Sequence, residues 1–204
     1  MSGRETAATI RREATELFFR QGYHGTSLRE VAAASGLKVG SLYNHIAGKD
    51  DLLLQIMGGI MDDLLVLHEQ AVTVTGDAVD TLLAALSVHL RFHAERAREV
   101  FIGNAELRNL EGEARATIVA KRHDYQLRLE RLVANAGEAG LAEVLTPRMH
   151  VYSMVANGNH LASWYRPEGP RPLDDIIGDY LRMHLRELNV TDSDTRVTRL
   201  LKAA

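Results

Sequence analysis

The chain has 204 residues, of which 46% are apolar and 25% charged, with a formal net charge of −3. This composition suits a folded chain with a sizeable core and excludes a collagen-like or proline-rich disordered chain. There is no cysteine, which excludes a disulfide scaffold, a thiol nucleophile and a zinc site built on thiolates. The first residues lack an apolar leader, and the longest apolar run, residues 52–61, is too short to span a bilayer. We therefore expect a cytoplasmic protein with no membrane partner.

Positive charge is concentrated at the N-terminal end of the chain. Residues 1–49 carry seven Lys or Arg against four Glu, a net +3, which leaves −6 for the rest. DNA binding requires positive charge near the phosphates rather than a basic protein overall. A small basic head on a larger acidic body is therefore compatible with a nucleic-acid partner, although chance unevenness gives the same pattern.

Apolar residues recur at helical spacing along the chain, and no stretch alternates as a strand does. The pattern predicts helices over 5–21, 27–34, 38–45, 50 to about 74, 78–95, 98–109, 113–136, 147–165 and 173–189. Thr146 and Pro147 mark the start of one of them, because proline is best tolerated at the first helical position. Residues 191–204 are polar and small, so we expect them to fray.

The second and third predicted helices are short and joined by a tight turn. Ser27 and Glu30 form a capping-box pattern at the start of the second helix. Gly36 lets the backbone reverse, and Val31 and Leu42 would pack the two helices together. Three helices in so short a segment, with a glycine in the turn, are typical of a helix-turn-helix.

The third helix has an unusual composition for a helix that only packs. Its outward face would carry Val39, Gly40, Ser41, Tyr43, Asn44 and His45. Gly40 lowers helix stability by about 1 kcal/mol relative to alanine, which indicates that the backbone approaches something closely. Hydroxyl, amide and imidazole groups form hydrogen bonds with phosphates and base edges, so this face predicts DNA contact.

A run of residues through this head also carries a family resemblance. The run comprises Gly22, Tyr23, Thr26, Ser27, Val31, Ala32, Ser35, Gly36, Leu37, Gly40, Ser41, Leu42, Tyr43, Asn44, His45, Ile46, Lys49 and Leu52. In order and spacing it resembles the DNA-binding head of TetR-family transcriptional repressors. The resemblance implies an all-helical homodimer whose C-terminal body binds an effector.

The resemblance also implies roles for single residues. Tyr43, His45 and Lys49 would touch DNA phosphates. Ser27, Arg29, Val39, Gly40 and Ser41 would lie near the DNA. Lys38 replaces the Ser or Thr that usually caps the third helix, and Val39 stands where a polar residue is common. Lys38 could add a phosphate contact and Val39 could reach a thymine methyl. The predicted DNA-binding residues are Ser27, Arg29, Lys38, Val39, Gly40, Ser41, Tyr43, Asn44, His45 and Lys49.

We therefore predict an all-α fold of about nine helices in two domains. A helix-turn-helix DNA-binding domain would span 1–49, and a helical effector-binding and dimerisation domain would span 50–190, followed by a frayed tail. Helices 147–165 and 173–189 carry apolar stripes wider than one buried side requires, so they predict pairing between subunits. The stripes are Met149, Tyr152, Val155, Ala162, Ile176, Ile177, Tyr180, Leu181, His184 and Leu188.

Polar side chains on otherwise apolar faces of residues 98–165 predict a small-molecule pocket in the body. Residues 163–170 resemble the end of the eighth helix in TetR-family regulators of fatty-acid, steroid or branched-chain catabolism, some of which bind acyl-coenzyme A. That resemblance implies that Trp164 lines an acyl pocket and Arg166 faces a phosphate; Trp164 in a dimer interface is an equal alternative. The predicted pocket residues are Phe101, Asn104, Tyr125, Asn157, Trp164 and Arg166.

Two pairs of body residues have open roles. His89 and His93 share one helix face at a spacing that could bind a metal ion, but no third ligand is evident. We therefore predict neither a metal site nor a cofactor. Gly58 and Gly59 either let a neighbouring helix pack closely or form a hinge in the long helix.

The sequence thus predicts a homodimeric repressor that binds a palindromic operator and is released by an acyl-coenzyme A or lipid-like effector. An enzyme is not expected, because no G-x-S-x-G, H-E-x-x-H or glycine-rich phosphate loop is present. The alternative is a helical ligand-binding or adaptor protein whose head contacts protein. An interaction helix of that kind would carry apolar anchors on the face of residues 40–49.

Overall fold

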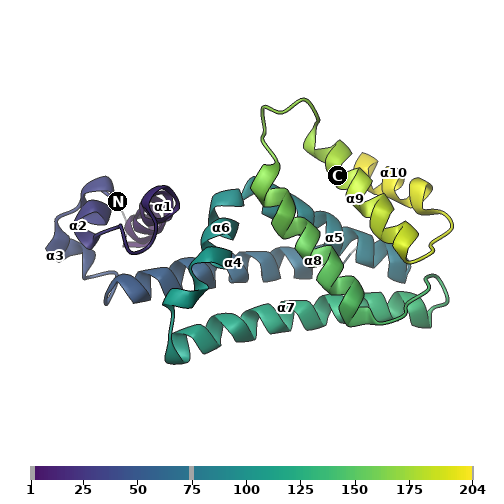
Figure 1. Ribbon diagram of the computed structural model, residues 1–204, viewed down its shortest axis with the longest axis horizontal. Helices are drawn as coiled ribbons and strands as arrows, with labels where there is room; N and C mark the ends of the chain where they lie inside the picture. Colours follow the sequence, from purple (N-terminus) through teal and green to yellow (C-terminus); the bar gives the residue numbers. More distant parts are fainter. Residues whose placement is uncertain (1–2, 74–75, 204) are drawn as a thin grey trace. The chain divides into compact units, whose positions relative to one another are not determined.

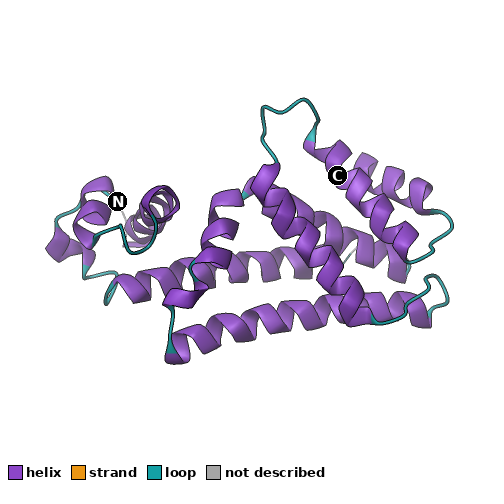
Figure 2. Cartoon of the chain, viewed as in Figure 1, coloured by secondary structure: helices purple, strands orange, loops and turns teal. Residues whose placement is uncertain are grey.

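The computed structural model describes residues 3–73 and 76–203. These residues form ten α-helices and one 3-10 helix joined by loops, with no strand among them (Figure 2). The elements, labelled in Figure 1, are α1 (Gly3–Gln21), α2 (Leu28–Ala34), α3 (Val39–Leu42), α4 (Lys49–Ala71), α5 (Ala78–Glu95), α6 (Ala97–Ala105), η1 (Leu107–Asn109), α7 (Gly112–Glu138), α8 (Pro147–Trp164), α9 (Leu173–Glu187) and α10 (Ser193–Ala203). The predicted all-α class is confirmed.

The chain divides into two compact units. The head unit contains the chain up to Asp62 together with Arg98–Lys121, and the body unit contains Asp63–Ala97 and the chain from Arg122 onward. The head unit therefore holds most of α6, all of η1 and the first part of α7 besides the three N-terminal helices. Within the described residues, no helix is both long enough and apolar enough to cross a membrane.

The first four helices of the chain each contribute buried apolar residues to the head unit. The buried residues are Ile10, Ala14 and Phe18 of α1, Val31 and Ala32 of α2, Leu42 of α3 and Leu52, Leu53, Ile56 and Met57 of α4. Gly22 and Gly36 have φ angles of +77° and +69°, a backbone conformation that glycine adopts without strain. They follow α1 and α2, so the reversal predicted at Gly36 is confirmed, and Gly22 ends α1 in the same way.

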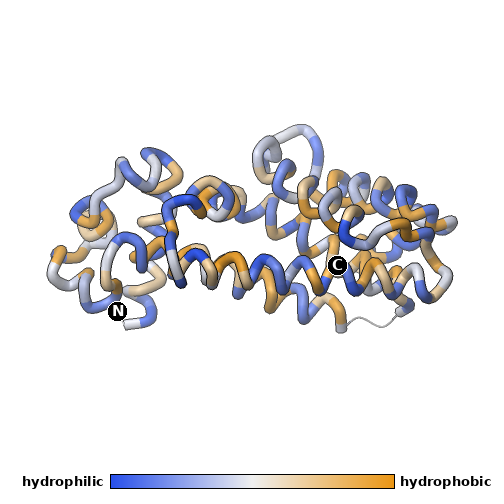
Figure 3. The backbone as a smooth tube through the Cα atoms, turned by 60° about the horizontal axis from the view of Figure 1, so that its bottom comes forward, coloured by the Kyte–Doolittle hydropathy of each residue, from blue (hydrophilic) through white to orange (hydrophobic). Residues whose placement is uncertain are grey.

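The body unit is built around α5, which contacts α8, α9 and α10. Hydrophobic and hydrophilic residues interleave along the helices in short blocks (Figure 3), as expected of amphipathic helices. At Gly158 the backbone of α8 approaches α5 closely, because a Cβ there would lie 2.3 Å from Nε2 of His89. A residue larger than glycine at 158 would therefore force the ring of His89 or the helix pair to move.

Two predicted helices end earlier than expected. The third helix was predicted over 38–45, but α3 spans only Val39–Leu42. Lys38 makes no capping hydrogen bond from its side chain, and residues 43–45 form a turn in which the His45 amide donates to the carbonyl of Leu42. The long helix was predicted to reach about Val74; α4 ends at Ala71, and Val74 lies outside the described residues.

The prediction that the tail frays is wrong, since residues 193–203 form α10. Val197 is fully buried, and Arg196 pairs with Asp77 and Asp80 at distances of 2.8 and 2.9 Å. The sequence pattern missed α10 because the helix is held by distant parts of the chain, through packing on α9 and α5 and the ion pairs of Arg196.

Candidate functional site

The start of α2 is fixed by the predicted capping box. The Glu30 amide donates to Oγ of Ser27 over 3.3 Å, and the Ser27 amide donates to the Glu30 carboxylate over 2.7 Å. The hydrogen bonds that the Ser27 amide and hydroxyl donate to the Glu30 carboxylate lower the pKa of Glu30. The box orients α2 with Arg29 exposed in its first turn.

The outward face of α3 and the turn after it is accessible. Lys38, Gly40, Tyr43 and Asn44 are exposed, and Tyr43 leaves 54% of its surface in contact with solvent. Val39, Ser41 and His45 are half-buried. The opposite side carries Leu42 and Ile46, which are buried. Tyr43 is therefore not needed for the core of the head.

Gly40 is not required by the packing of the head itself. Among the described residues, apart from the adjacent residues and the backbone of the same helix, no heavy atom lies within 4 Å of the position that a Cβ would take there. The glycine weakens a helix of four residues without relieving any clash within the chain. Its small size is useful only if something outside the chain approaches the backbone.

Lys49 has a structural role that the sequence did not predict. Its Nζ donates hydrogen bonds of 2.9 Å to the backbone carbonyls of Tyr23 and Thr26, and it lies over the Tyr23 ring. The Tyr23 hydroxyl donates to Asp50, and burial with this carboxylate raises the pKa of Tyr23. Lys49 thus ties the first turn of α4 to the loop that precedes α2.

Residues of α6 and η1 also hold that loop within the head unit. The Tyr23 amide donates to Oε1 of the buried Glu106 over 3.4 Å, and His24 Nε2 lies 2.8 Å from Oδ1 of Asn109. The rings of Phe19 and Phe101 meet edge to face with centroids 5.3 Å apart. These contacts fix the loop between α1 and α2 from a distant part of the sequence.

The six predicted pocket residues are not all in one unit. Phe101 and Asn104 are exposed and belong to the head unit, where Phe101 packs on Phe19. The expectation that Phe101 lies on an inward face of the body came from extending one helical pattern over 98–109, whereas α6 ends at Ala105 and buries Val100, Ile102 and Gly103.

The other four pocket residues belong to the body unit and differ in burial. Tyr125 is buried and its hydroxyl lies 2.9 Å from Nδ1 of His89. Asn157 is half-buried on α8. Trp164 is 43% exposed at the end of α8, and the exposed Arg166 donates to the carbonyls of Ser163 and Tyr165. Of these four, only Tyr125 lies in the core.

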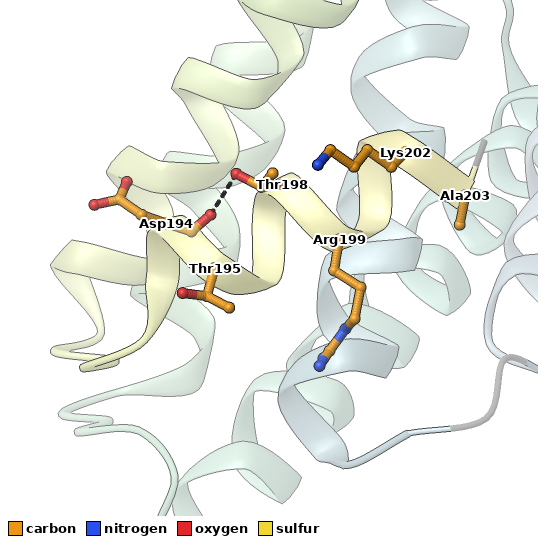
Figure 4. A pocket seen from close by; sticks show the side chains of 6 residues that line it. All are labelled: Asp194, Thr195, Thr198, Arg199, Lys202 and Ala203. Carbon is orange, nitrogen blue, oxygen red and sulfur yellow. Dashed lines mark hydrogen bonds between the residues drawn. The ribbon is translucent and has the colours of Figure 1, made fainter.

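A surface hollow runs along α10, away from the predicted pocket residues. Its lining consists of Asp194, Thr195, Thr198, Arg199, Lys202 and Ala203 (Figure 4). All six are exposed residues of one helix, and half of them are charged. Such a lining does not suit an apolar effector, because it supplies no enclosed apolar surface.

Sequence reasoning missed two buried histidines of the body, His68 and His184. His68 follows Leu64 by one helical turn on the buried stripe of α4, so its burial could have been inferred from spacing. His184 was assigned to a subunit interface, but it is 2% exposed within the chain itself. The Tyr125 ring that meets His68 comes from α7, whereas Tyr180 and Glu187 beside His184 lie on its own helix.

The all-helical fold and the α2–turn–α3 arrangement define a helix-turn-helix protein with a separate helical body. Residues 10–56 match the family described as bacterial regulatory proteins, tetR family. Residues 75–188 match the family described as tetracyclin repressor-like, C-terminal domain. The chain therefore belongs to the TetR family of bacterial transcriptional regulators.

Individual relatives agree with this assignment. The chain is 25% identical over 174 residues to the transcriptional repressor KstR2 of Mycobacterium tuberculosis H37Rv, covering 84% of this chain and 87% of KstR2. The crystal structure of AibR in complex with isovaleryl coenzyme A and operator DNA is similar, with a TM-score of 0.81 and 28% identity, covering 88% of this chain and 98% of AibR. A TetR-family protein from Rhodococcus RHA1 has a TM-score of 0.84 at 25% identity, covering 92% and 98% of the two chains.

Proposed function

We propose that this chain is a repressor that binds an inverted-repeat operator as a homodimer and is released by an apolar, acyl-coenzyme A or lipid-like effector. The observation that carries the proposal is the exposed face of Lys38, Gly40, Tyr43 and Asn44 on a helix-turn-helix head. This face combines a cation, hydrogen-bonding groups and an accessible backbone, which are the features that contact DNA phosphates and base edges.

We assign DNA binding to residues 1–49, and effector binding and dimerisation to residues 50–190. Ser27, Arg29, Val39, Ser41, His45 and Lys49 complete the proposed DNA-binding set. Lys49 already donates two of its three N–H groups to backbone carbonyls, so only one remains for a phosphate. Its main contribution is to position the loop before α2.

The proposed dimer surface lies on the outward faces of α8 and α9. Met149 and Tyr152 of α8 and Met183 of α9 are 62%, 49% and 58% exposed. Large apolar side chains exposed together on one unit are typical of an interaction surface. Trp164 is also partly exposed, which favours the interface alternative over a pocket lining.

The effector class is supported by the relatives. AibR was crystallised with isovaleryl coenzyme A and operator DNA, and another neighbour of this fold is the ketosteroid regulator KstR2. Isovaleryl is an apolar acyl group, and a ketosteroid is a largely apolar molecule with a carbonyl group. For this chain, we infer that release proceeds through α4 and through the α6 and η1 contacts on the head. A coupling of about 1–3 kcal/mol would change operator affinity roughly 5- to 150-fold.

The test is selection of bound sequences from random double-stranded DNA by the full chain, followed by titration at two salt concentrations. We expect an inverted repeat, and we expect Tyr43→Ala with Asn44→Ala to abolish selective binding. His123→Gln, an exposed change on α7, serves as the control and should bind as the unaltered chain does. Failure to enrich any sequence, with the chain folded and dimeric, would favour an adaptor protein instead.

A further inference from the structure

Four histidines and a tyrosine are buried in the core of the body unit, and we call them the histidine cluster. They are His68 of α4, His89 and His93 of α5, Tyr125 of α7 and His184 of α9, each at most 6% exposed. The Tyr125 ring lies 5.5 Å from His68 and 5.7 Å from His89, and the His89 and His93 rings are 4.0 Å apart. His68 and His184 are close enough to His89 for their charged forms to lower its pKa.

Some polar atoms of the cluster are paired. The Tyr125 hydroxyl lies 2.9 Å from Nδ1 of His89, and Nδ1 of His93 donates to the His89 carbonyl over 2.8 Å. Nε2 of His89 lies against the backbone of α8 at Gly158. The Val155 carbonyl raises the pKa of His89 slightly, but it does not meet the geometry of a hydrogen bond with Nε2. His89 is therefore held in place, and it in turn holds the Tyr125 hydroxyl.

Besides Nε2 of His89, two further ring nitrogens of the cluster are unpaired among the described residues. In the described part of the chain, Nδ1 of His68 and Nε2 of His184 have no hydrogen-bond partner, although their residues are 3% and 2% exposed. Buried polar atoms in folded proteins are nearly always hydrogen-bonded, and leaving one unpaired is unfavourable. Leucine at either position would fill similar space without that cost, so packing alone does not account for the two imidazoles.

The chemistry of the cluster favours an uncharged ligand group. Burial lowers the pKa of His68, His89, His93 and His184, so the rings are neutral at pH 7. A neutral ring nitrogen donates or accepts one hydrogen bond according to its tautomer, and it supplies no positive charge for a carboxylate or phosphate. A carbonyl or hydroxyl oxygen on an apolar molecule matches both the nitrogens and the apolar core around them.

We propose that the histidine cluster is a binding site for the uncharged carbonyl or hydroxyl oxygen of an apolar molecule, with His68 and His184 as its hydrogen-bonding partners. Tyr125, oriented by His89, adds a third group. The inference rests on the proposed function in one respect, since it identifies this molecule as the effector; an acyl thioester carbonyl belongs to the same chemical class.

The experiment uses the full chain without DNA, with ¹⁵N in its imidazole rings. Titration with 2-octanone and with 1-octanol should shift the ring resonances of His68 and His184. Octanoate at pH 8 should bind at least tenfold more weakly, a difference of about 1.4 kcal/mol. His68→Leu and His184→Leu should each weaken 2-octanone binding at least tenfold, while the unliganded variants should melt at the same temperature as the unaltered chain or higher.

His123→Leu, an exposed change two residues before Tyr125, should leave both binding and melting unchanged. Unshifted His68 and His184 resonances at saturating 2-octanone and 1-octanol would overturn the proposal, and this measurement needs no variant to fold. The proposal would also be overturned if both leucine variants bound 2-octanone as tightly as the unaltered chain does. Octanoate binding as tight as 2-octanone binding would overturn it too. Selective DNA binding with no ketone binding would reject this site alone, whereas ketone binding without selective DNA binding would reject the repressor function alone.

Discussion

The ammonium group of Lys49 lies 4.4 Å from the centre of the Tyr23 ring and donates a 2.9 Å hydrogen bond to the Tyr23 carbonyl. A second bond reaches the carbonyl of Thr26, and both acceptor residues are buried. Thr26 directly precedes Ser27, the residue that caps α2. Lys49, for which the family resemblance implies a phosphate contact, therefore positions the helix-turn-helix.

We expect Lys49→Ala to destabilise the chain by about 1–3 kcal/mol, because the Thr26 carbonyl loses its Lys49 donor and the Tyr23 carbonyl keeps only the amide of Thr26. Urea denaturation of the full chain measures the loss. Lys38→Ala is the matched control: Lys38 is exposed and makes no capping bond, so stability should change by less than about 0.5 kcal/mol. Lys38→Ala should instead make DNA binding less dependent on salt, by the amount expected for the loss of about one phosphate contact. A Lys49→Ala chain of unaltered stability would contradict the structural role.

Gly58 and Gly59 do not serve close packing. Among the described residues, apart from the adjacent residues and the backbone of α4 itself, no heavy atom lies within 4 Å of a Cβ built at either position. Gly58→Ala and Gly59→Ala should therefore each stabilise α4 by about 0.5–1 kcal/mol, which thermal melting or urea denaturation can measure. Gly158→Ala is the contrasting variant, because its Cβ would clash with His89, and it should destabilise by about 1–3 kcal/mol.

The same variants test the hinge alternative. If α4 bends at Gly58 and Gly59 during release, the double alanine variant should retain operator binding and lose part of its response to effector. Unaltered effector response, together with the expected gain in stability, would remove the hinge from the mechanism.

Local chemistry made the head largely predictable from the sequence. The Ser27–Glu30 box, the reversal at Gly36 and the burial of Val31 and Leu42 each depend on residues a few positions apart. Helix spacing likewise predicted the body helices other than α10 to within a few residues of their observed ends.

The contacts that the sequence did not predict are distant along the chain. Phe101 meets Phe19, and Arg196 meets Asp77 and Asp80 more than a hundred residues away. A helical pattern shows which side chains share a face but not which other helix that face meets. This is why Phe101 was expected in a pocket and why α10 was expected to fray.

The histidine cluster should make stability depend on pH. Burial lowers the pKa of His93 to about 4 and that of His89 well below its ordinary value, whereas an unfolded histidine titrates near 6.5. Below about pH 6.5 the unfolded chain therefore binds more protons than the folded chain. The free energy of unfolding should fall between about pH 6.5 and 4, by up to about 1.4 kcal/mol per pH unit for each buried histidine.

Urea denaturation at pH 7.5, 6 and 5 measures this dependence. His93→Gln should make it shallower, because one neutral buried imidazole is removed. His123→Gln changes an exposed ring and should leave the slope unaltered. Identical slopes in all three chains would show that the buried imidazoles do not govern acid stability.

The docking of α10 depends on Arg196. Its guanidinium is 10% exposed and binds Asp77, Asp80 and Asp192, and its hydrogen bonds lower the pKa of Asp77. Arg196→Met should destabilise the chain by about 1–3 kcal/mol, less than for a fully buried pair because the carboxylates are partly exposed. Arg199→Met is the control: Arg199 is 61% exposed and pairs with Asp80 alone, so urea denaturation should detect less than about 1 kcal/mol. Equal effects of the two changes would argue against a specific role for Arg196.

The proposed dimer predicts opposite results for two neighbouring residues of α9. Met183 is 58% exposed, whereas Leu181 is fully buried within its own chain. Met183→Glu should leave the fold intact and weaken dimerisation at least tenfold, about 1.4 kcal/mol, because each interface would bury two carboxylates. Leu181→Asp should instead unfold the chain, so it cannot report on the interface. Sedimentation at micromolar concentration, with circular dichroism for folding, separates the two outcomes.

Leu145→Glu provides the matched control for Met183→Glu. Leu145 is 94% exposed in the loop between α7 and α8, so the same change of an apolar side chain to a carboxylate should leave the dimer unaltered. Loss of the dimer should also weaken operator binding, since one short recognition helix contacts only half of an inverted repeat. If the unaltered chain sediments as a monomer, or if Met183→Glu remains as dimeric as Leu145→Glu, the outward faces of α8 and α9 are not the subunit interface.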